Sequence, residues 1–217
     1  MTGGCFFCII FQLMKCQRGF YRAGVRTLGC VLVLLSGFPL LLGQAFAHTH
    51  FKEKRWELRT GYAYQYTNNS RPNNFQIIPL YPSLAVPLTD IKGSSWYRGR
   101  FVLNPELFLA SFTHPYVRPI FGVTPIQFSY SFEPAKSRFS PYLFAGAGVL
   151  WADVDRRETR SRTNFNLQGG AGTRYRMTEK TSLILEYRHI HISNAGLHED
   201  NAGLNTNTFL VGVSVKD

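Results

Sequence analysis

Hydrophobic and polar residues alternate with a period of two over most of residues 56–215. In residues 56–66, mostly aromatic and aliphatic side chains at the even positions alternate with Glu57, Arg59 and Gln65 at odd positions. Such alternation places the two sets on opposite faces of a β-strand. The pattern predicts strands over residues 56–66, 95–110 (with a kink at Asn104–Pro105), 117–132, 141–153, 164–177, 181–193 and 207–215.

One stretch departs from this regular pattern. Residues 75–86 read as extended and largely apolar, but Pro79, Pro82 and the following Pro87 lack the N–H groups that a central strand donates. We therefore predict an irregular or bulged strand there, which brings the number of strands to eight.

Eight strands with one apolar face and one polar, glycine-containing face are typical of a small outer-membrane β-barrel. We predict an all-β, eight-stranded antiparallel transmembrane β-barrel in which the polar face lines the lumen. A soluble exported lipid-binding barrel, with its apolar face turned inward, is the alternative. The polar lumen residues are expected to pair with one another: Glu57, Arg59, Gln168, Arg174, Arg176, Glu186 and Arg188.

The predicted connections differ in length between the two ends of the barrel. Loops 154–163 and 194–206 are long, whereas 178–180 is a tight turn. Outer-membrane barrels have long extracellular loops and short periplasmic turns. With the N-terminus in the periplasm, the end of strand 181–193 is expected to lie at the outer leaflet.

The first 47 residues have the features of a cleaved signal peptide. Four cations precede an apolar run over residues 28–42, and an Ala-Phe-Ala sequence ending at Ala47 matches the pattern ahead of a cleavage site. The run is short for a membrane anchor and is interrupted by a glycine and a proline. We predict cleavage after Ala47, with Met14 as an alternative start, and a single barrel domain over residues 48–217.

All four cysteines lie within this predicted signal peptide, so the mature chain is expected to have no disulfide. The mature chain has 20 lysines and arginines against 13 acidic residues, a net charge of +7, compared with +11 for the whole chain. The cations are scattered and form no basic stripe or nucleic-acid-binding motif, so no nucleic-acid partner is expected. An anionic lipid surface suits an exported basic protein better.

Residues 183–205 carry the candidate chemistry. On the predicted strand 181–193, Leu185, Tyr187, His191 and Ser193 share one face. The imidazole of His191 and the hydroxyl of Ser193 are close enough there for proton transfer, which is the minimum arrangement for a serine nucleophile. A metal site formed by the histidines at 189, 191 and 198 is an alternative, although no acidic partner has a fixed position.

The sequence HISNAGLHEDNAGLN, from His191 to Asn205, strongly resembles the lipid A 3-O-deacylase (PagL) family of outer-membrane esterases. The resemblance implies that His191 and Ser193 are catalytic and that Asn194 and Asn201 donate hydrogen bonds to the oxyanion. It also implies an enzyme that hydrolyses the 3-O-linked acyl chain of lipid A in the outer leaflet of a Gram-negative outer membrane. Such an enzyme needs no cofactor and no metal.

One position departs from the family pattern. Asn205 stands where the family has the glutamate that orients the histidine. We expect Asn205 to orient His191 through a neutral hydrogen bond, with Glu199 or Asp200 as alternatives. The departure also keeps open a catalytically silent barrel of the same family, with a structural or envelope-stress role.

The remaining candidate residues concern the substrate. The acyl chain is expected to lie over Leu185 and Tyr187, and His189 is predicted to pack or to act as a polar neighbour. Arg156 and Arg157 are candidates for contacts with lipid A phosphates, with a solvated basic loop as the alternative. The expected partners are lipid A or lipopolysaccharide and outer-membrane lipid, and the sequence leaves open whether two barrels form a homodimer.

Overall fold

The computed structural model describes residues 53–65, 75–114, 117–152, 161–199 and 201–217. All of them belong to the second of two compact units of the chain, residues 49–217. The predicted signal peptide lies outside the described residues, as do Arg156, Arg157 and Asp200. In the described part of the chain, no helix is long and apolar enough to cross a membrane.

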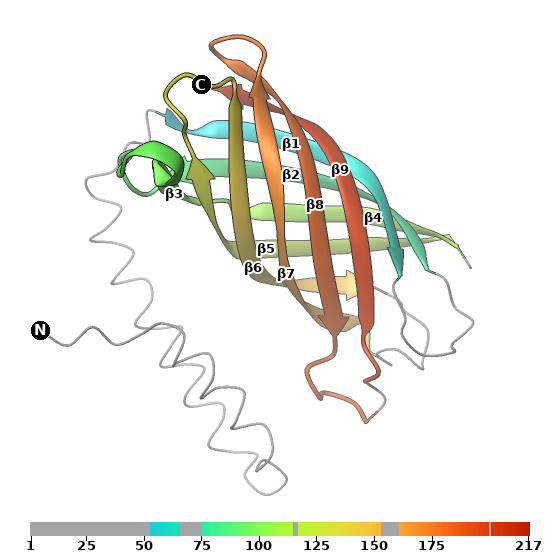
Figure 1. The fold of residues 1–217 in the computed structure, drawn as a ribbon. Coiled ribbons are helices and arrows are strands. Elements are labelled where there is room, and N and C mark those ends of the chain that lie inside the picture. Colours follow the sequence, from blue (N-terminus) through green and yellow to red (C-terminus); the bar gives the residue numbers. More distant parts are fainter. Residues whose placement is uncertain (1–52, 66–74, 115–116, 153–160, 200) are drawn as a thin grey trace, which may run out of the picture. The chain divides into compact units, whose positions relative to one another are not determined.

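The described residues form an antiparallel β-sheet with one short 3₁₀ turn, η3 (Ser95–Tyr97). The strands rise along the barrel in Figure 1, with tight turns and the C-terminus at one end and the loop after β8 at the other. Their bounds are β1 (Arg55–Gln65), β2 (Gln76–Pro87), β3 (Gly99–Leu103), β4 (Glu106–His114), β5 (Arg118–Phe132), β6 (Phe139–Ala152), β7 (Thr163–Arg176), β8 (Thr181–Ser193) and β9 (Leu204–Lys216).

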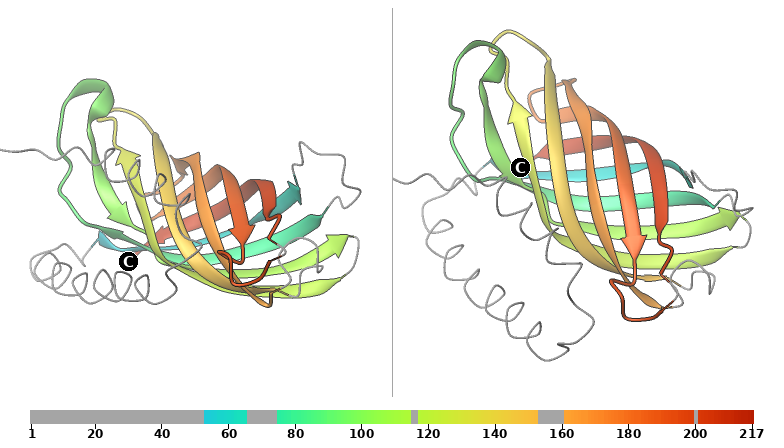
Figure 2. Two further views of the ribbon diagram at one scale, coloured as in Figure 1. Left: turned by 90° about the horizontal axis from the view of Figure 1, so that it is seen from below. Right: turned by 60° about the horizontal axis from the view of Figure 1, so that its bottom comes forward.

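The sheet closes into a ring of eight strand positions, as predicted. Strand β1 pairs with both β2 and β9, which joins the two ends of the sheet (Figures 1 and 2). Strands β3 and β4 both lie between β2 and β5, so together they fill one position of the ring. The break between them falls at Asn104–Pro105, where the sequence predicted a kink.

The prediction of an irregular second strand was only partly correct. Strand β2 is a full member of the ring and pairs with β1 on one side and with β3 and β4 on the other. Its pairing with β1 skips Ile78 and Pro79, and its pairing with β4 skips Tyr81 and Pro82. The prolines therefore interrupt the ladders locally, while a closed barrel still holds the strand from both sides.

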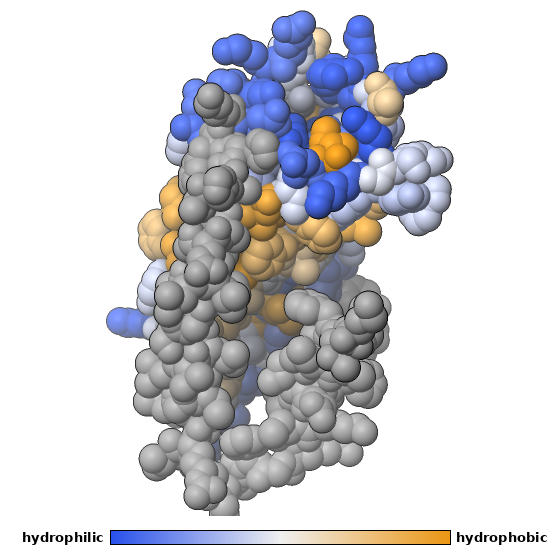
Figure 3. Space-filling view, turned by 90° about the vertical axis from the view of Figure 1, so that its left-hand side faces the viewer, coloured by the Kyte–Doolittle hydropathy of each residue, from blue (hydrophilic) through white to orange (hydrophobic). Residues whose placement is uncertain are grey.

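The two faces of the strands differ as the alternation predicted. Outward positions on β1 and β8 are mostly apolar and exposed, whereas Glu57, Arg59, Glu186 and Arg188 point inward and are buried. Figure 3 shows, on the face that it draws, hydrophilic residues gathered at one end of the barrel and hydrophobic residues in the band beside them. This distribution is the one that a membrane-spanning barrel requires.

The middle of the lumen contains a ring of four paired charges. Arg59 contacts Glu186 at 2.7 Å and Glu106 at 2.9 Å. Arg188 contacts Glu106 at 2.7 Å and also pairs with Glu186. Tyr142 donates a further hydrogen bond of 2.6 Å to Glu186. Each of the two arginines thus contacts both glutamates, and the two positive and two negative charges cancel.

The lumen network around this ring also includes the predicted Glu57–Arg174 pair and Gln168, which donates to Glu106, so it differs from the predicted set at two positions. Glu106, which the sequence pattern did not single out, is central to it. Glu106 points inward because the buried even-numbered positions Arg100, Val102 and Asn104 continue in register past the strand break. Arg176 is exposed near the tight-turn end and donates to the backbone carbonyl of Ser137.

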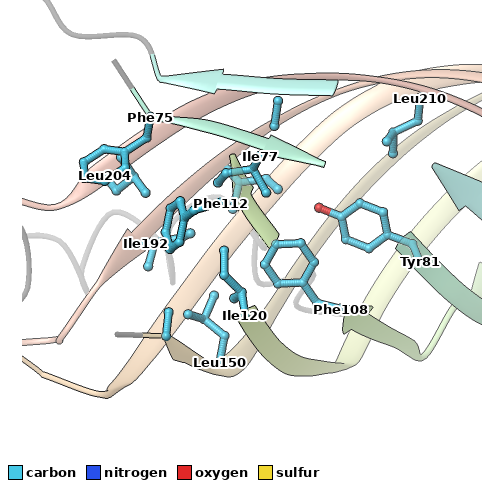
Figure 4. Close-up of a cluster of buried hydrophobic side chains, with 13 residues drawn as sticks. Phe75, Ile77, Tyr81, Phe108, Phe112, Ile120, Leu150, Ile192, Leu204 and Leu210 are labelled. Carbon is cyan, nitrogen blue, oxygen red and sulfur yellow. The ribbon is translucent and has the colours of Figure 1, made fainter. Parts of the chain in front are cut away.

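The end of the lumen next to the loop after β8 is filled by apolar side chains. Ile190 and Ile192 of β8 and Leu204 of β9 belong to this cluster, and each is at most 2 % exposed. They pack with Phe75, Phe112 and Leu150 from across the barrel (Figure 4). The inward side chains that flank residue 191 are therefore held in a solid core, which fixes the strand on which His191 lies.

We expect Glu106→Gln to destabilise the barrel by about 3 kcal/mol, because Arg59 and Arg188 would then share one carboxylate in a buried site. The urea midpoint of the detergent-folded barrel, followed by its heat-modifiable gel mobility, measures the change. Glu179→Gln, in the exposed turn between β7 and β8, is the matched control and should leave the midpoint unchanged. Equal midpoints for the two variants would contradict a stabilising role for the charge ring.

Candidate active site on the outer face of the barrel

Strand β8 carries the candidate catalytic residues on its outward face. Leu185 and Tyr187 are exposed on this face, and His191 and Ser193 continue it toward the loop, each half-buried. The intervening Ile190 and Ile192 point into the core. The imidazole and the hydroxyl therefore lie on the outer face of the barrel wall, as the alternation predicted.

A hydrogen bond to β9 orients His191. Asn205 lies directly opposite His191 in the antiparallel register, and its Oδ1 is 2.8 Å from His191 Nδ1. Because a carbonyl oxygen only accepts hydrogen bonds, Nδ1 carries the proton and Nε2 keeps its lone pair. This is the tautomer that a general base needs.

Strand β9 begins at Leu204, three residues before the predicted start at residue 207. Asn205 is consequently part of the strand and is held by its ladder, whereas the sequence pattern assigned it to the loop. Glu199, the described alternative partner for His191, is exposed in that loop.

Ser193 lies two residues beyond His191, about 6.6 Å farther along the same face at the usual rise of a strand. Within the described residues, no hydrogen bond joins the two side chains. Catalytic hydrogen bonds are often long in unliganded enzymes and shorten when substrate is present. The arrangement places a candidate base and a candidate nucleophile on one strand, with Nε2 of His191 not used by the contact with Asn205.

The chain after Ser193 makes a tight turn with unusual backbone angles. Leu197 N–H donates to Asn194 O at 3.1 Å, and both central residues have left-handed backbone, Ala195 with φ 53° and Gly196 with φ 83°. A non-glycine residue in this region is strained, and such strain is frequent beside catalytic groups. The sequence did not single out Ala195, because nothing in an alanine side chain signals its backbone conformation.

The two predicted oxyanion donors, Asn194 and Asn201, are bonded to each other. Asn194 is fully buried, its backbone N–H donates to Asn201 Oδ1 at 2.9 Å, and its Oδ1 accepts from Gly196 N–H at 2.8 Å. Its side-chain amide also lies 3.4 Å from the carbonyl oxygen of His198. Asn194 therefore shapes the loop, whereas Asn201 is exposed and uses its oxygen in this contact, which leaves its two N–H groups for another acceptor.

Gly203 is a positioning residue that the sequence pattern did not reveal. Its φ is 74°, and a Cβ at this position would lie 2.9 Å from Cε1 of His191 and 3.3 Å from the carbonyl oxygen of Ile192. The bare backbone of Gly203 thus packs against the edge of the imidazole. The requirement depends on the pairing of β8 with β9, which sequence reasoning alone does not supply.

We expect Gly203→Ala to lower kcat by at least about tenfold, because the new methyl group must displace the His191 ring. Gly196→Ala is the matched control, since Gly196 also has a positive φ but has no atom within 4 Å of the added Cβ. Both changes introduce about 1 kcal/mol of backbone strain. Similar kcat values for the two variants would show that strain, and not the contact with His191, decides the effect.

A second polar cluster lies next to the first on the same face. Asn207 is opposite His189 in the register, and its Oδ1 accepts from His189 Nδ1 at 3.0 Å and from the hydroxyl of Tyr187 at 2.9 Å. His189 is therefore a polar neighbour of His191, one of the two roles considered for it.

An open, largely apolar groove of about 560 Å³ continues along this face, away from the loop. Leu185, Tyr187, Phe209 and Val211 line it. On the β7 side, exposed Leu167 lies opposite His191, and exposed Phe165 lies opposite Ser193. The sequence pattern singles out Leu185 and Tyr187 but not the β7 and β9 residues, because their position beside the groove depends on the strand register.

In the part of the chain that the structure describes, no group of three or more His, Cys, Asp and Glu residues is arranged to hold a metal ion. His198 is exposed in the loop, away from the strand face that carries His189 and His191.

The chain is similar to a known protein family and to solved structures of outer-membrane proteins. Residues 46–214 match the protein family described as "Lipid A 3-O-deacylase (PagL)". The crystal structure of the outer membrane enzyme PagL superposes with a TM-score of 0.54 at 20 % identity, covering 73 % of this chain and 97 % of that one. Neisserial surface protein A (NspA) superposes with a TM-score of 0.53 at 16 % identity, covering 76 % and 97 %.

No curated protein sequence matches the chain. At these identities the structural matches establish the fold, that of an outer-membrane β-barrel, and the family match covers nearly the whole barrel. The chain belongs to the lipid A 3-O-deacylase (PagL) family.

Proposed function

We propose that this protein hydrolyses the 3-O-linked acyl ester of lipid A, with Ser193 as nucleophile and His191 as general base. The observation that carries the proposal is the 2.8 Å contact between His191 Nδ1 and Asn205 Oδ1 on the strand face that also presents Ser193. A histidine held in the base tautomer beside a serine has a chemical use that a structural barrel does not need.

Acylation of the serine is the first half of the proposed reaction. Ser193 Oγ attacks the ester carbonyl carbon while His191 Nε2 takes the hydroxyl proton. The carbonyl oxygen becomes an oxyanion, and the tetrahedral intermediate then expels the sugar oxygen, which receives the proton from His191. The product is an acyl-serine and a free sugar hydroxyl.

Water completes the cycle. His191 Nε2 removes a proton from a water molecule, the resulting hydroxide attacks the acyl-serine, and Ser193 leaves with the proton returned by His191. The fatty acid is released and the enzyme is restored. No metal or cofactor takes part in these steps.

The oxyanion needs N–H donors near Ser193. We assign this role to Asn201, whose amide N–H groups are not used in its contact with Asn194, and to the strained turn that begins at Asn194. Asn194 then acts by holding Asn201 and the turn in place, which revises the donor role first predicted for its side chain.

Asn205 replaces the carboxylate of the family pattern with a neutral group. It fixes the tautomer and the ring plane of His191, but it stabilises the imidazolium formed during acylation less than a carboxylate would. We therefore propose an active enzyme whose turnover is limited by this position.

The proposed setting is the outer leaflet of the outer membrane. The long loop after β8 lies at one end of the barrel and the tight turn between β7 and β8 at the other, the asymmetry of barrels with their long loops outside (Figure 1). His191 and Ser193 then lie at the depth of the outer-leaflet glycolipid, and the groove along Leu185 and Phe209 accepts the acyl chain.

Mass spectrometry of lipid A tests the function. Lipid A from cells that express the protein should lose the mass of one 3-O-linked acyl chain, whereas lipid A from cells with the empty vector should not. An unchanged lipid A, with the barrel folded in the outer membrane, would favour the catalytically silent barrel.

A further inference from the structure

The lumen opens into a basic hollow at the tight-turn end of the barrel. This hollow has a volume of about 250 Å³, and hydrophilic residues gather at this end of the molecule in Figure 3. Of the charged side chains that line it, seven are basic and three are acidic. Even when Glu57 is added, because it pairs with the lining residue Arg174, the hollow keeps an excess of three positive charges. The proposed esterase mechanism uses none of these residues.

Two acidic residues of the hollow are already shared between its cations. Glu133 contacts Arg100 at 3.1 Å and Arg55 at 3.8 Å. Glu53 contacts Arg100 and also lies 3.9 Å from Lys216. Two carboxylates therefore serve three cations, and the hollow stays positive.

Two guanidinium groups in the hollow keep N–H donors that have no acceptor. Arg174 is only 4 % exposed, and its Nε donates to Glu57 at 2.8 Å. Its two terminal nitrogens donate to no described residue, and the half-buried Arg55 donates no side-chain hydrogen bond within the described part of the chain. Both side chains also line a smaller cavity of about 10 Å³, which leaves room beside them for an atom the size of a water oxygen. Buried donors without an acceptor are costly, and an arginine with unused N–H groups is a strong binder of anion oxygens.

Two further cations lie in the turns that border the hollow. Arg138 precedes β6 and Lys180 precedes β8, and both are exposed. Among the described residues, neither side chain has an acidic partner. Buried donors inside the hollow and unpaired cations at its opening together concentrate anions there.

The hollow is closed toward the other end of the barrel. The ring of Arg59, Glu106, Glu186 and Arg188 occupies the middle of the lumen, and the apolar cluster around Ile192 fills the part beyond it. An anion that enters at the tight-turn end therefore cannot cross the barrel. The hollow is suited to binding and not to conduction.

We propose that this hollow binds a small phosphate-bearing anion with at least two negative charges. The guanidinium fork matches the spacing of phosphate oxygens and forms two parallel N–H···O bonds with them. The volume of about 250 Å³ is below the usual range for drug-sized ligands, which limits the occupant to a small anion. The inference is independent of the proposed esterase function.

The same phosphate chemistry has two possible sources, a free anion and the headgroup of an anionic phospholipid. Three serines that line the hollow occupy inward strand positions: Ser214 is buried, Ser182 is opposite it, and Ser140 is opposite the buried Arg174. The hollow therefore lies inside the ring of strands, and a lipid would have to leave its leaflet to place its headgroup there. This placement favours a free anion that enters from the aqueous side.

Isothermal titration calorimetry of the detergent-folded protein with pyrophosphate, at low ionic strength, tests the proposal. The wild type should bind one pyrophosphate per barrel, and its urea midpoint should rise in the presence of pyrophosphate, because only the folded state has the site. Arg55→Gln should weaken binding roughly tenfold, because it removes one charged hydrogen-bond donor. Arg138→Gln should weaken it by a smaller factor, since Arg138 lies at the exposed border.

Lys136→Gln is the matched control for Arg138→Gln. Lys136 is exposed in the same turn and carries the same charge, but it does not line the hollow, so its loss should leave the dissociation constant unchanged. Equal weakening by these two variants would overturn the proposal in favour of diffuse surface charge. Absence of saturable binding by the wild type, or equal dissociation constants for the wild type and Arg55→Gln, would also overturn it.

A lipid arm of the experiment separates the two sources of phosphate. Phosphatidylglycerol added to the detergent micelles should not reduce the binding of pyrophosphate, because the lipid stays outside the ring of strands. Competition by phosphatidylglycerol would overturn the assignment to a free anion and give the hollow to a lipid headgroup.

Discussion

Ser193→Ala is expected to lower lipid A deacylation by at least about a thousandfold, because it removes the atom that forms the acyl intermediate. The residual rate would come from binding and from the oxyanion donors alone. The measurement is kcat for release of the fatty acid by the detergent-folded protein, with folding checked by heat-modifiable gel mobility.

Ser182→Ala is the matched control for this change. Ser182 is on the same strand, near the opposite end of β8, so its loss should leave kcat unchanged. A Ser193→Ala protein that folds and keeps the wild-type rate would show that another group performs the attack.

Asn205→Leu should lower kcat by about a hundredfold. Leucine has nearly the same size but offers no acceptor, so His191 loses the contact of 2.8 Å that selects its tautomer and its ring plane. In a serine protease, a partner that holds the histidine in the wrong tautomer costs about ten thousandfold in kcat. We expect less here, because a neutral amide contributes less than a carboxylate to begin with.

Asn205→Glu provides the reverse comparison at the same position. A carboxylate opposite His191 should keep Nδ1 protonated and also stabilise the imidazolium, so kcat should rise several-fold above the wild-type value. Wild-type activity in Asn205→Leu would exclude Asn205 as the orienting group, and no gain in Asn205→Glu would indicate that orientation does not limit turnover.

The barrel was largely predictable because the two faces of each strand differ in polarity. The bounds of β8 match the predicted strand 181–193, since apolar residues mark its outer face and Glu186 and Arg188 its inner one. The start of β9 was missed for the opposite reason. Thr206 and Thr208 are buried in the lumen although they are polar, and the outward Asn205 and Asn207 are polar as well. Hydropathy alone therefore does not separate this part of the strand from a loop.

The site was predictable only where it lies on one strand. His191 and Ser193 are two residues apart, so the period of a strand was enough to place them on one face. The contacts of Gly203 with His191 and of Asn207 with His189 and Tyr187 join β8 to β9, and their register depends on how the loop between these strands folds. A sequence without aligned homologues does not determine that register.

The stable parts of the barrel and the proposed chemistry occupy opposite sides of its wall. The charge ring around Glu106 and the apolar cluster around Ile192 fill the lumen, whereas His191 and Ser193 are on the outer face. This separation lets a rigid strand hold the proposed catalytic groups in place, as a preorganised site requires. The same separation leaves the outer face of β8 free of structural contacts with the lumen core, so the proposed substrate can approach along this face.

Labelling with a fluorophosphonate tests the central claim most directly, because this reagent reacts with a serine that a neighbouring base has activated. After incubation of the detergent-folded protein, peptide mass spectrometry should find a phosphonyl adduct on Ser193, and His191→Phe should abolish it. Absence of an adduct from Ser193, or equal labelling in His191→Phe, would contradict an activated serine on the outer face of the barrel.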